Sequence, residues 1–304
     1  MSVAVAMDTA GSSERRFQLL ALSVRIATDC PILDGKLEYL AQDACQDYDM
    51  TGEIHLHALR QADGYRICEA GTEPRTEADS TMALGRLHFR SYQRAYEMLP
   101  RSGLFLHAAC GSYEGRRFLL LGESGAGKTT LITRLLGLGA LAEGDELALL
   151  EGAGVSALPR RFHIKSTGID HFPWLGNQLH RLPRHDNGDG TSIYAFAPSD
   201  WGFPWHIRNA GIDAVLILDP NHGGQSRIRE IPHHQMIQYA IAHLRPLDQS
   251  QRSWLPALCR HFDRAFCGRL VLGSLDSAAS LLISKLSDLP APGSAGRHSS
   301  NGGK

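Results

Sequence analysis

The stretch from Gly122 to Thr129 holds the residue types in this chain that are best suited to chemistry. It reads Gly-Glu-Ser-Gly-Ala-Gly-Lys-Thr and matches the pattern G-x-x-x-x-G-K-[ST], the Walker A motif or P-loop. In such a loop, glycines let backbone N–H groups point at a phosphate, and the following helix N-terminus adds partial positive charge. Lys128 is positioned to reach the β- and γ-phosphates, and the Thr129 hydroxyl to ligate Mg²⁺. The sequence therefore predicts a site for a nucleoside triphosphate and Mg²⁺.

Every residue of the loop and the first turn of the helix is expected to contact the nucleotide. These residues are Gly122, Glu123, Ser124, Gly125, Ala126, Gly127, Lys128, Thr129 and Thr130.

The elements that must position the loop are a strand before it and a helix after it. Residues 118–121 form a short apolar run typical of a buried strand. Apolar residues at 131, 132, 135 and 136 follow the helical period, and Gly137 and Gly139 close the helix. Residues 104–110 read as the neighbouring strand and carry His107, 21 positions before Lys128. If these strands pair, His107 lies near the loop; the alternative is a histidine satisfied at a strand end.

An acidic pair, Asp145-Glu146, follows Lys128 by 17 and 18 positions, inside residues 141–150, which read as one strand. A carboxylate at the sheet edge beside the loop would hold Mg²⁺ or accept the proton of an attacking hydroxyl. A charged strand end at the surface is the simpler interpretation. Asp219, which ends the apolar run 214–218, is a rival for the metal carboxylate.

A basic cluster is the third candidate group: Arg160, Arg161 and Lys165. Such side chains would neutralise phosphate charge, although basic residues beside a turn are more often solvated.

Four segments are expected along the 304 residues: a disordered N-terminus (1–15), an α+β module (16–100), a P-loop catalytic domain (101–289) and a disordered tail (290–304). In the module, residues 17–26 read as one strand and residues 53–68 as a hairpin turning at Asp63-Gly64. A helix is expected over 81–99, where Pro100 stops it. Its apolar stripe is read as a core face: Met82, Leu84, Leu87, Phe89, Tyr92, Tyr96 and Leu99.

Composition excludes several classes of function. The 31 basic and 32 acidic residues give a net charge of −1, which argues against a nucleic-acid partner. No apolar run is long enough to span a membrane, and the N-terminus lacks the pattern of a signal peptide. The six cysteines include no C-x-x-C pair. We expect a cytoplasmic protein with reduced thiols.

Residues 104–170 together with the strand at 214–219 resemble the catalytic domain of bacterial HPr kinase/phosphorylase and its HPr-kinase-like relatives. In that family a histidine on the preceding strand, a G-x-S-G-x-G-K-[ST] loop and an acidic pair occur in this order. Here they are His107, Gly122–Thr129 and Asp145-Glu146. The resemblance implies an α/β fold with a P-loop kinase core akin to that of phosphoenolpyruvate carboxykinase. It also implies assembly into homo-oligomers.

The resemblance implies serine kinase chemistry with ATP and Mg²⁺. Lys128 would hold the β/γ-phosphates, Thr129 and Asp145 the metal, and the acidic pair aided by His107 would activate an acceptor hydroxyl. Residues 176–206 are a candidate substrate-facing element. The chain differs from HPr kinase/phosphorylase in having His163 where a metal-binding glutamate is expected and Lys165 in place of an arginine.

With these differences the chain is more similar to divergent HPr-kinase-like proteins that phosphorylate precursor peptides in natural-product pathways. The expected acceptor is thus a Ser or Thr of a peptide or small protein, with a small-molecule alcohol as the alternative. A regulatory nucleotide-binding protein and a simple ATPase are the rival functions. The choice of Asp145, Glu146 or His107 as the base stays open.

Overall fold

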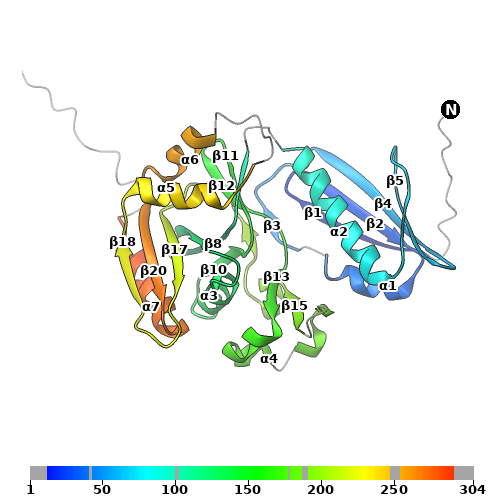
Figure 1. Ribbon diagram of the computed structural model, residues 1–304. Coiled ribbons are helices and arrows are strands. Elements are labelled where there is room, and N and C mark those ends of the chain that lie inside the picture. Colours follow the sequence, from blue (N-terminus) through cyan, green and yellow to red (C-terminus); the bar gives the residue numbers. More distant parts are fainter. Residues whose placement is uncertain are drawn as a thin grey trace, which may run out of the picture. The chain divides into compact units, whose positions relative to one another are not determined.

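The structure is a computed structural model that describes residues 12–40, 43–99, 103–176, 179–186, 191–246 and 254–290. It is a mixed α/β protein with several sheets, as the sequence predicts. The chain divides into two compact units, one of residues 1–43 and 48–99, the other of residues 44–47 and 100–304 (Figure 1). A short strand within the first hundred residues therefore belongs to the second unit.

The first unit is built on a five-stranded sheet in the order β1-β2-β4-β5-β6. β2 and β4 are parallel, and the other neighbours are antiparallel. Apolar side chains alternate along β4 and β5 and bury one face of the sheet, as in Leu56, Ala58, Tyr65 and Ile67. The strands are β1 (Ser13–Leu19), β2 (Leu22–Thr28), β4 (Gly52–Gln61), β5 (Gly64–Glu69) and β6 (Arg75–Glu77).

Two predictions for the start of this unit are wrong. The expected single strand over 17–26 is a hairpin, because the chain reverses after Leu19 with Leu20 at φ 53°. No glycine or proline marks this turn. β1 also begins at Ser13, inside the stretch expected to be disordered, because Ser13 pairs with Thr28 and Arg15 forms an ion pair with Asp34 at 2.9 Å. Residues 1–11 lie outside the described residues, as do residues 291–304 of the expected disordered tail.

Helices α1 (Pro31–Leu37) and α2 (Ser80–Glu97) complete the first unit. The carboxylate of Asp79 caps α2 by accepting hydrogen bonds from two backbone N–H groups of the first turn. The predicted helix is confirmed and stops before Pro100, but its buried stripe is narrower than expected. Met82 and Phe89 are 55% and 56% exposed, because they lie on the helix surface opposite the buried Leu84 and Leu87.

The core of the second unit is a six-stranded sheet in the order β10-β8-β9-β17-β20-β18. β9, β17 and β20 run parallel, and β8 lies antiparallel beside β9. The expected pairing of residues 104–110 with the loop strand is thus confirmed for residues 108–110 alone. The strands are β8 (Ala108–Tyr113), β9 (Arg116–Leu121), β10 (Leu141–Gly144), β17 (Ala214–Pro220), β18 (Arg227–Glu230) and β20 (Phe266–Leu272).

Both faces of this sheet are covered. Phe118 and Leu120 pack on one side with α3 (Lys128–Leu136) and α7 (Leu275–Ser287). Leu119 and Leu121 pack on the other side with α5 (His233–Ala242) and α6 (Trp254–Phe262). A continuous apolar run is what a strand buried on both faces requires, which explains why residues 118–121 show no alternation.

A second sheet of four strands, in the order β12-β11-β7-β19, packs against the α5 side of the central sheet. Its strands are β7 (Leu104–Leu106), β11 (Ala148–Glu151), β12 (Gly154–Ala157) and β19 (Leu244–Pro246). A three-stranded sheet contains β13 (Phe162–Lys165), β15 (Ser192–Phe196) and β14 (Arg184–Asp186). β3 (Cys45–Gln46) pairs with β16 (His206–Ile207). The remaining short helices are η1 (Ser166–His171), α4 (Pro173–Gly176), η2 (Leu179–Arg181) and η3 (Pro198–Trp201).

A buried ion pair ties β9 to β10. Arg117 Nη2 lies 2.7 Å from Glu143 Oε2, and these side chains are 3% and 0% exposed. Arg208 Nη2 is 3.2 Å from the other carboxylate oxygen. A buried charge without these partners would be costly, so the pair fixes the strand that leads to Asp145. In the part of the chain that the structure describes, no helix combines the length and the apolar character needed to span a membrane.

Candidate functional site

The predicted phosphate loop lies between β9 and α3, in the strand–loop–helix arrangement that its motif requires. Gly125 and Gly127 have φ values of +83° and +93°, which L side chains rarely adopt. A Cβ on Gly122 would lie 2.9 Å from the Ala126 side chain, so the loop closes tightly on itself. Glycine is therefore needed at these positions for conformation or for space. Ser124 and Gly125 are exposed, and Thr130 is half-buried.

The Lys128 ammonium is held inside this loop. Its Nζ donates to the carbonyl oxygens of Gly122 at 2.8 Å and Glu123 at 3.1 Å. The residue is 7% exposed, and burial lowers the pKa of its amine despite the opposing effect of the Glu146 and Asp145 carboxylates. The amine is therefore placed among the loop atoms that would surround a phosphate.

Two strands of the second unit bend at the candidate residues, and this corrects two predictions. Residues 104–110 are not one strand: β7 ends at Leu106, β8 begins at Ala108, and His107 stands at the break. Residues 141–150 likewise separate into β10 and β11 on either side of Asp145-Glu146. The chain passes from the four-stranded to the six-stranded sheet at His107 and back to the four-stranded sheet at Asp145-Glu146.

The two bends are joined to each other. Ala108 N donates to Glu146 O at 3.0 Å, with Leu106 paired to Ala148 on one side and Cys110 to Gly144 on the other. Because β10 runs parallel to β9 with β8 between them, the acidic pair lies at the same edge of the sheet as the phosphate loop. The strand carrying it is two places from the loop strand.

Asp145 is the centre of the polar network. Thr129 Oγ1 donates to Asp145 Oδ2 at 2.9 Å, and the backbone N–H of His163 donates to the same oxygen at 3.2 Å. Arg160 Nη2 donates to Asp145 Oδ1 at 3.0 Å. The Asp145 side chain is only 1% exposed. The buried Asp145 carboxylate thus accepts hydrogen bonds from three groups, and one of them is the hydroxyl of the last residue of the loop motif.

Glu146 occupies a different environment although it is the next residue. Its side chain is 44% exposed and accepts from Arg160 Nη2 at 3.3 Å. His107 Nε2 lies 3.8 Å from Glu146 Oε1. The structure therefore brings together His107, both carboxylates, Thr129 and Arg160. The two carboxylates differ in access, since one is enclosed and the other faces solvent.

The other members of the predicted basic cluster do not join this network. Arg161 Nη1 pairs with Asp200 at 2.8 Å, an interaction that supports η3. Lys165 is exposed at the end of β13. Asp219, the rival carboxylate, also lies at the loop edge of the sheet, but its Oδ2 lies 3.7 Å from Arg269 Nη1. Among the described residues, no hydrogen bond joins Asp219 to Thr129.

A second polar group beside the loop was missed by sequence reasoning. His243 Nε2 lies 3.6 Å from Glu123 Oε1, and its ring centroid is 6.3 Å from that of His107. The His243 carbonyl accepts the backbone N–H of His107 at 3.0 Å, and Tyr239 packs on the His243 ring at 4.6 Å. No spacing rule relates residue 243 to the loop, because their proximity depends on the non-local pairing of β19 with β7.

The candidate substrate-facing stretch, residues 176–206, lies partly outside the described residues. Its strand β15 pairs with β13, whose His163 touches Asp145. Trp205, which lies in this stretch, is 5% exposed and donates its indole N–H to the Glu143 carbonyl at 3.0 Å. Trp205 therefore supports the acidic strand from within the core.

The oxygen donors fit Mg²⁺ better than a transition metal. Among the described residues, no three His, Cys, Asp or Glu side chains form a metal-binding group. Mg²⁺ in phosphoryl-transfer sites commonly takes one or two protein oxygens and completes its shell with phosphates and water. The Thr129 hydroxyl and the Asp145 carboxylate, 2.9 Å apart, are such a donor set.

Comparison with known proteins adds no family assignment. No protein-family model matches the chain, and a search of curated proteins found no match.

Proposed function

We propose that this protein is an ATP-dependent kinase that transfers the γ-phosphoryl group to a Ser or Thr hydroxyl of a peptide or small protein. The observation that supports this most is the Thr129–Asp145 hydrogen bond. It places a buried carboxylate at the metal-binding end of the phosphate loop, with the more exposed Glu146 beside it. We also propose that the second unit has the P-loop kinase core of the HPr kinase and phosphoenolpyruvate carboxykinase type.

Nucleotide binding would rest on the loop and Lys128. The backbone N–H groups of residues 122–130 receive the phosphates, and Lys128 exchanges its carbonyl partners for β/γ-phosphate oxygens. Mg²⁺, held by Thr129 and Asp145, would neutralise the charge that develops on the phosphate oxygens. Arg160 would supply further positive charge on the same side.

The two carboxylates would have separate roles. Asp145 already accepts hydrogen bonds from Thr129, His163 and Arg160, so its oxygens are occupied by groups that orient it for the metal. Glu146 is 44% exposed and is the carboxylate that an acceptor hydroxyl can reach. We assign Glu146 as the proton acceptor and His107, 3.8 Å away, as the group that orients it.

In the proposed transfer, one bond to the γ-phosphorus forms as another breaks. The acceptor oxygen forms a bond to the γ-phosphorus while the bond between that phosphorus and the bridging oxygen of ADP breaks. The hydroxyl proton passes to Glu146. Most of the rate would come from positioning and charge neutralisation, because little covalent chemistry falls to the protein.

One observation favours a second candidate, a regulatory nucleotide-binding protein. Arg160 contacts both carboxylates at 3.0 and 3.3 Å, so a fixed cation already occupies the side on which a hydroxyl would approach. If Arg160 stays there when nucleotide binds, the site holds ATP without transferring phosphate.

Product analysis with γ-labelled ATP separates the candidates. The full chain is incubated with Mg²⁺, labelled ATP and a pool of Ser- and Thr-containing peptides. Label on a peptide hydroxyl supports the kinase, label only in free phosphate indicates an ATPase, and nucleotide binding without turnover indicates a regulatory protein. A Lys128→Ala variant serves as the blank, since every candidate needs this lysine.

A further inference from the structure

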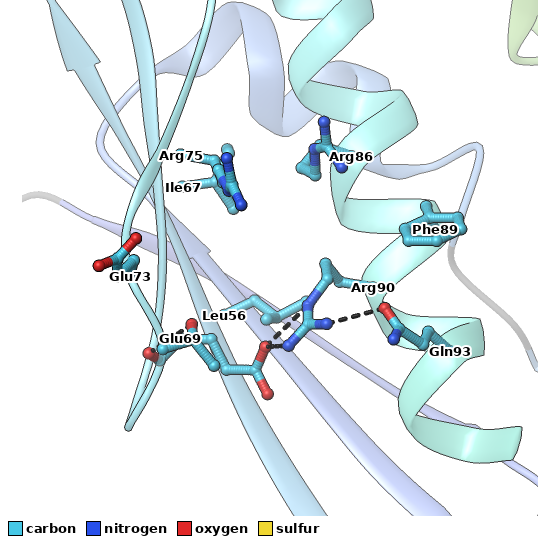
Figure 2. Close-up of a pocket in the computed structure, with 10 residues that line it drawn as sticks. Leu56, Ile67, Glu69, Glu73, Arg75, Arg86, Phe89, Arg90 and Gln93 are labelled. Atoms are coloured by element: carbon cyan, nitrogen blue, oxygen red, sulfur yellow. Dashed lines mark hydrogen bonds and ion pairs between the residues drawn. The ribbon is translucent and has the colours of Figure 1, made fainter. Parts of the chain in front are cut away.

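The first unit contains a pocket that has no part in the phosphate chemistry. It lies between α2 and the β5–β6 end of the sheet and has a volume of about 390 Å³. Buried Leu56 and Ile67 form its floor, and Phe89 stands at its rim (Figure 2). This volume falls in the range of small-ligand sites.

Arginines line the walls of this pocket. Arg75 comes from the strand side, and Arg86 and Arg90 come from the helix side (Figure 2). Arg86 Nε donates to Glu77 at 2.7 Å, and Arg90 pairs with Glu69. Because Glu69 and Glu77 are each 9% exposed, they fix these guanidinium groups in place. The donors are therefore preorganised before any ligand arrives.

Arg75 and Arg86 keep most of their hydrogen-bond donors free. A guanidinium has five N–H groups, and Arg86 uses its Nε in the ion pair. Within the described residues Arg75 has no ion pair, and it is exposed. Glu69 and Glu77 are held by Arg90 and Arg86, so Arg75 is the guanidinium of the lining that has no ion pair among the described residues. It can pair with one carboxylate of a ligand.

The rim extends the pocket into a longer apolar strip. Met82 and Phe89, both more than half exposed, are seven residues apart on α2 and therefore share one face. Met82 precedes Arg86 and Arg90 by four and eight residues, a mean separation of about 9 Å along the helix axis at 1.5 Å per residue. An extended peptide covers that distance with about three residues. The strip thus fits a peptide with an acidic side chain over the arginines and an apolar side chain about three residues away.

We propose that this pocket, the arginine pocket, binds an acidic–apolar segment of the peptide acceptor, away from the hydroxyl that is phosphorylated. The inference rests on the proposed peptide kinase function. The first unit would then select the substrate and the second unit would carry out the transfer.

A peptide array without nucleotide tests the arginine pocket separately from the chemistry. Labelled full-length protein is applied to hexapeptides that hold Glu and Leu three residues apart, and to matched peptides with Gln in place of Glu. We expect at least fivefold more binding to the Glu peptides. Arg75→Glu and Phe89→Ser should each remove this preference. Both residues are exposed, so the variants should fold.

The matched control is Arg66→Glu, which makes the same charge change on the opposite face of β5, where Arg66 is exposed. The proposal is wrong if Glu and Gln peptides bind equally or if Arg66→Glu has the same effect as Arg75→Glu. Transfer of label is measured in a separate assay. A selective array with no transfer would overturn the kinase alone, and transfer without selectivity would overturn the pocket alone.

Discussion

The hydroxyl of Thr129 in the first turn of α3 and the carboxylate of Asp145 just after β10 are joined by a 2.9 Å hydrogen bond. Thr129 belongs to the phosphate loop, and Asp145 stands where β10 leaves the sheet. In P-loop NTPases the loop Ser or Thr and an acidic residue hold Mg²⁺ together, so this contact is what the proposed metal role of Asp145 requires. This contact is the basis for separating the roles of the two acidic residues.

Exchanging each carboxylate for its amide should give different defects. We expect Asp145→Asn to raise the Mg²⁺ concentration needed for half-maximal transfer while ATP binding changes little. Glu146→Gln should lower kcat by about 10²-fold or more at unchanged Mg²⁺ requirement, because a general base contributes about that much. Mg²⁺ titrations of initial rate, with a fluorescent ATP analogue for binding, measure both. Equal Mg²⁺ dependence in the two variants would contradict the assignment.

Arg160 and Arg161 form a matched pair for testing the basic cluster. Their side chains are 15% and 12% exposed and each holds a carboxylate, but only Arg160 touches the acidic pair. Arg160→Ala should lower kcat by about 10²-fold, the scale for loss of one charge-stabilising donor. Arg161→Ala should leave kcat within a few fold and lower only stability. Unchanged or faster transfer in Arg160→Ala would show that Arg160 blocks the site.

Alanine substitutions at two glycines separate an effect on stability from an effect on ATP binding. Gly125 and Gly139 have φ values of +83° and +91°, and a Cβ on either would have no atom within 4 Å. Alanine at each should lower the free energy of unfolding by about 1–2 kcal/mol, the cost of a left-handed L residue. Only Gly125→Ala should weaken ATP binding, since Gly139 follows the far end of α3. Urea titrations and binding isotherms of both variants give the comparison.

Burial of Cys110 predicts how stability depends on pH. Burial, reinforced by the neighbouring Glu143 carboxylate, raises the pKa of this thiol well above its ordinary value. Above about pH 9 the unfolded thiol loses its proton while the folded one keeps it, so the folded state binds more protons. The free energy of unfolding should therefore fall by about 1.4 kcal/mol per pH unit from this group. Urea titrations between pH 8 and 10 measure the slope.

Cys110→Ala should remove that contribution and flatten the slope. Replacing the exposed Cys45 by alanine is the control and should leave the slope as in the wild type. A wild-type slope in Cys110→Ala would mean that other groups cause the loss of stability.

Local patterns predicted the phosphate loop and its flanks well, because each signal lies within the segment itself. Residues 118–121, the glycines and the apolar spacing of α3 need no distant partner to be read. The two bends at His107 and Asp145 could not be predicted in this way. Residues 104–110 are apolar except for His107, and only the partners of Leu106 and Ala108 reveal that the strand changes sheets.

The contacts of His243 and Arg160 were hidden for the same reason. His243 reaches Glu123 because β19 pairs with β7, where Leu244 lies opposite Leu106, 138 positions earlier in the chain. Arg160 was a candidate from its charge, but nothing in its spacing showed that it, and not Arg161, faces the acidic pair. The sequence indicated which residue types could form the site, and non-local strand pairing determines which of those residues lie together.

The paired bends also have a mechanical consequence. His107 and Glu146 stand at bends whose flanking strands are hydrogen-bonded to each other, so the two segments form one rigid brace. Lys128 belongs to α3, which is linked to this brace by a side-chain hydrogen bond, from Thr129 to Asp145. Thermal motion of α3 would thus change the gap between the lysine and the carboxylates while the spacing of His107 and Glu146 stays fixed.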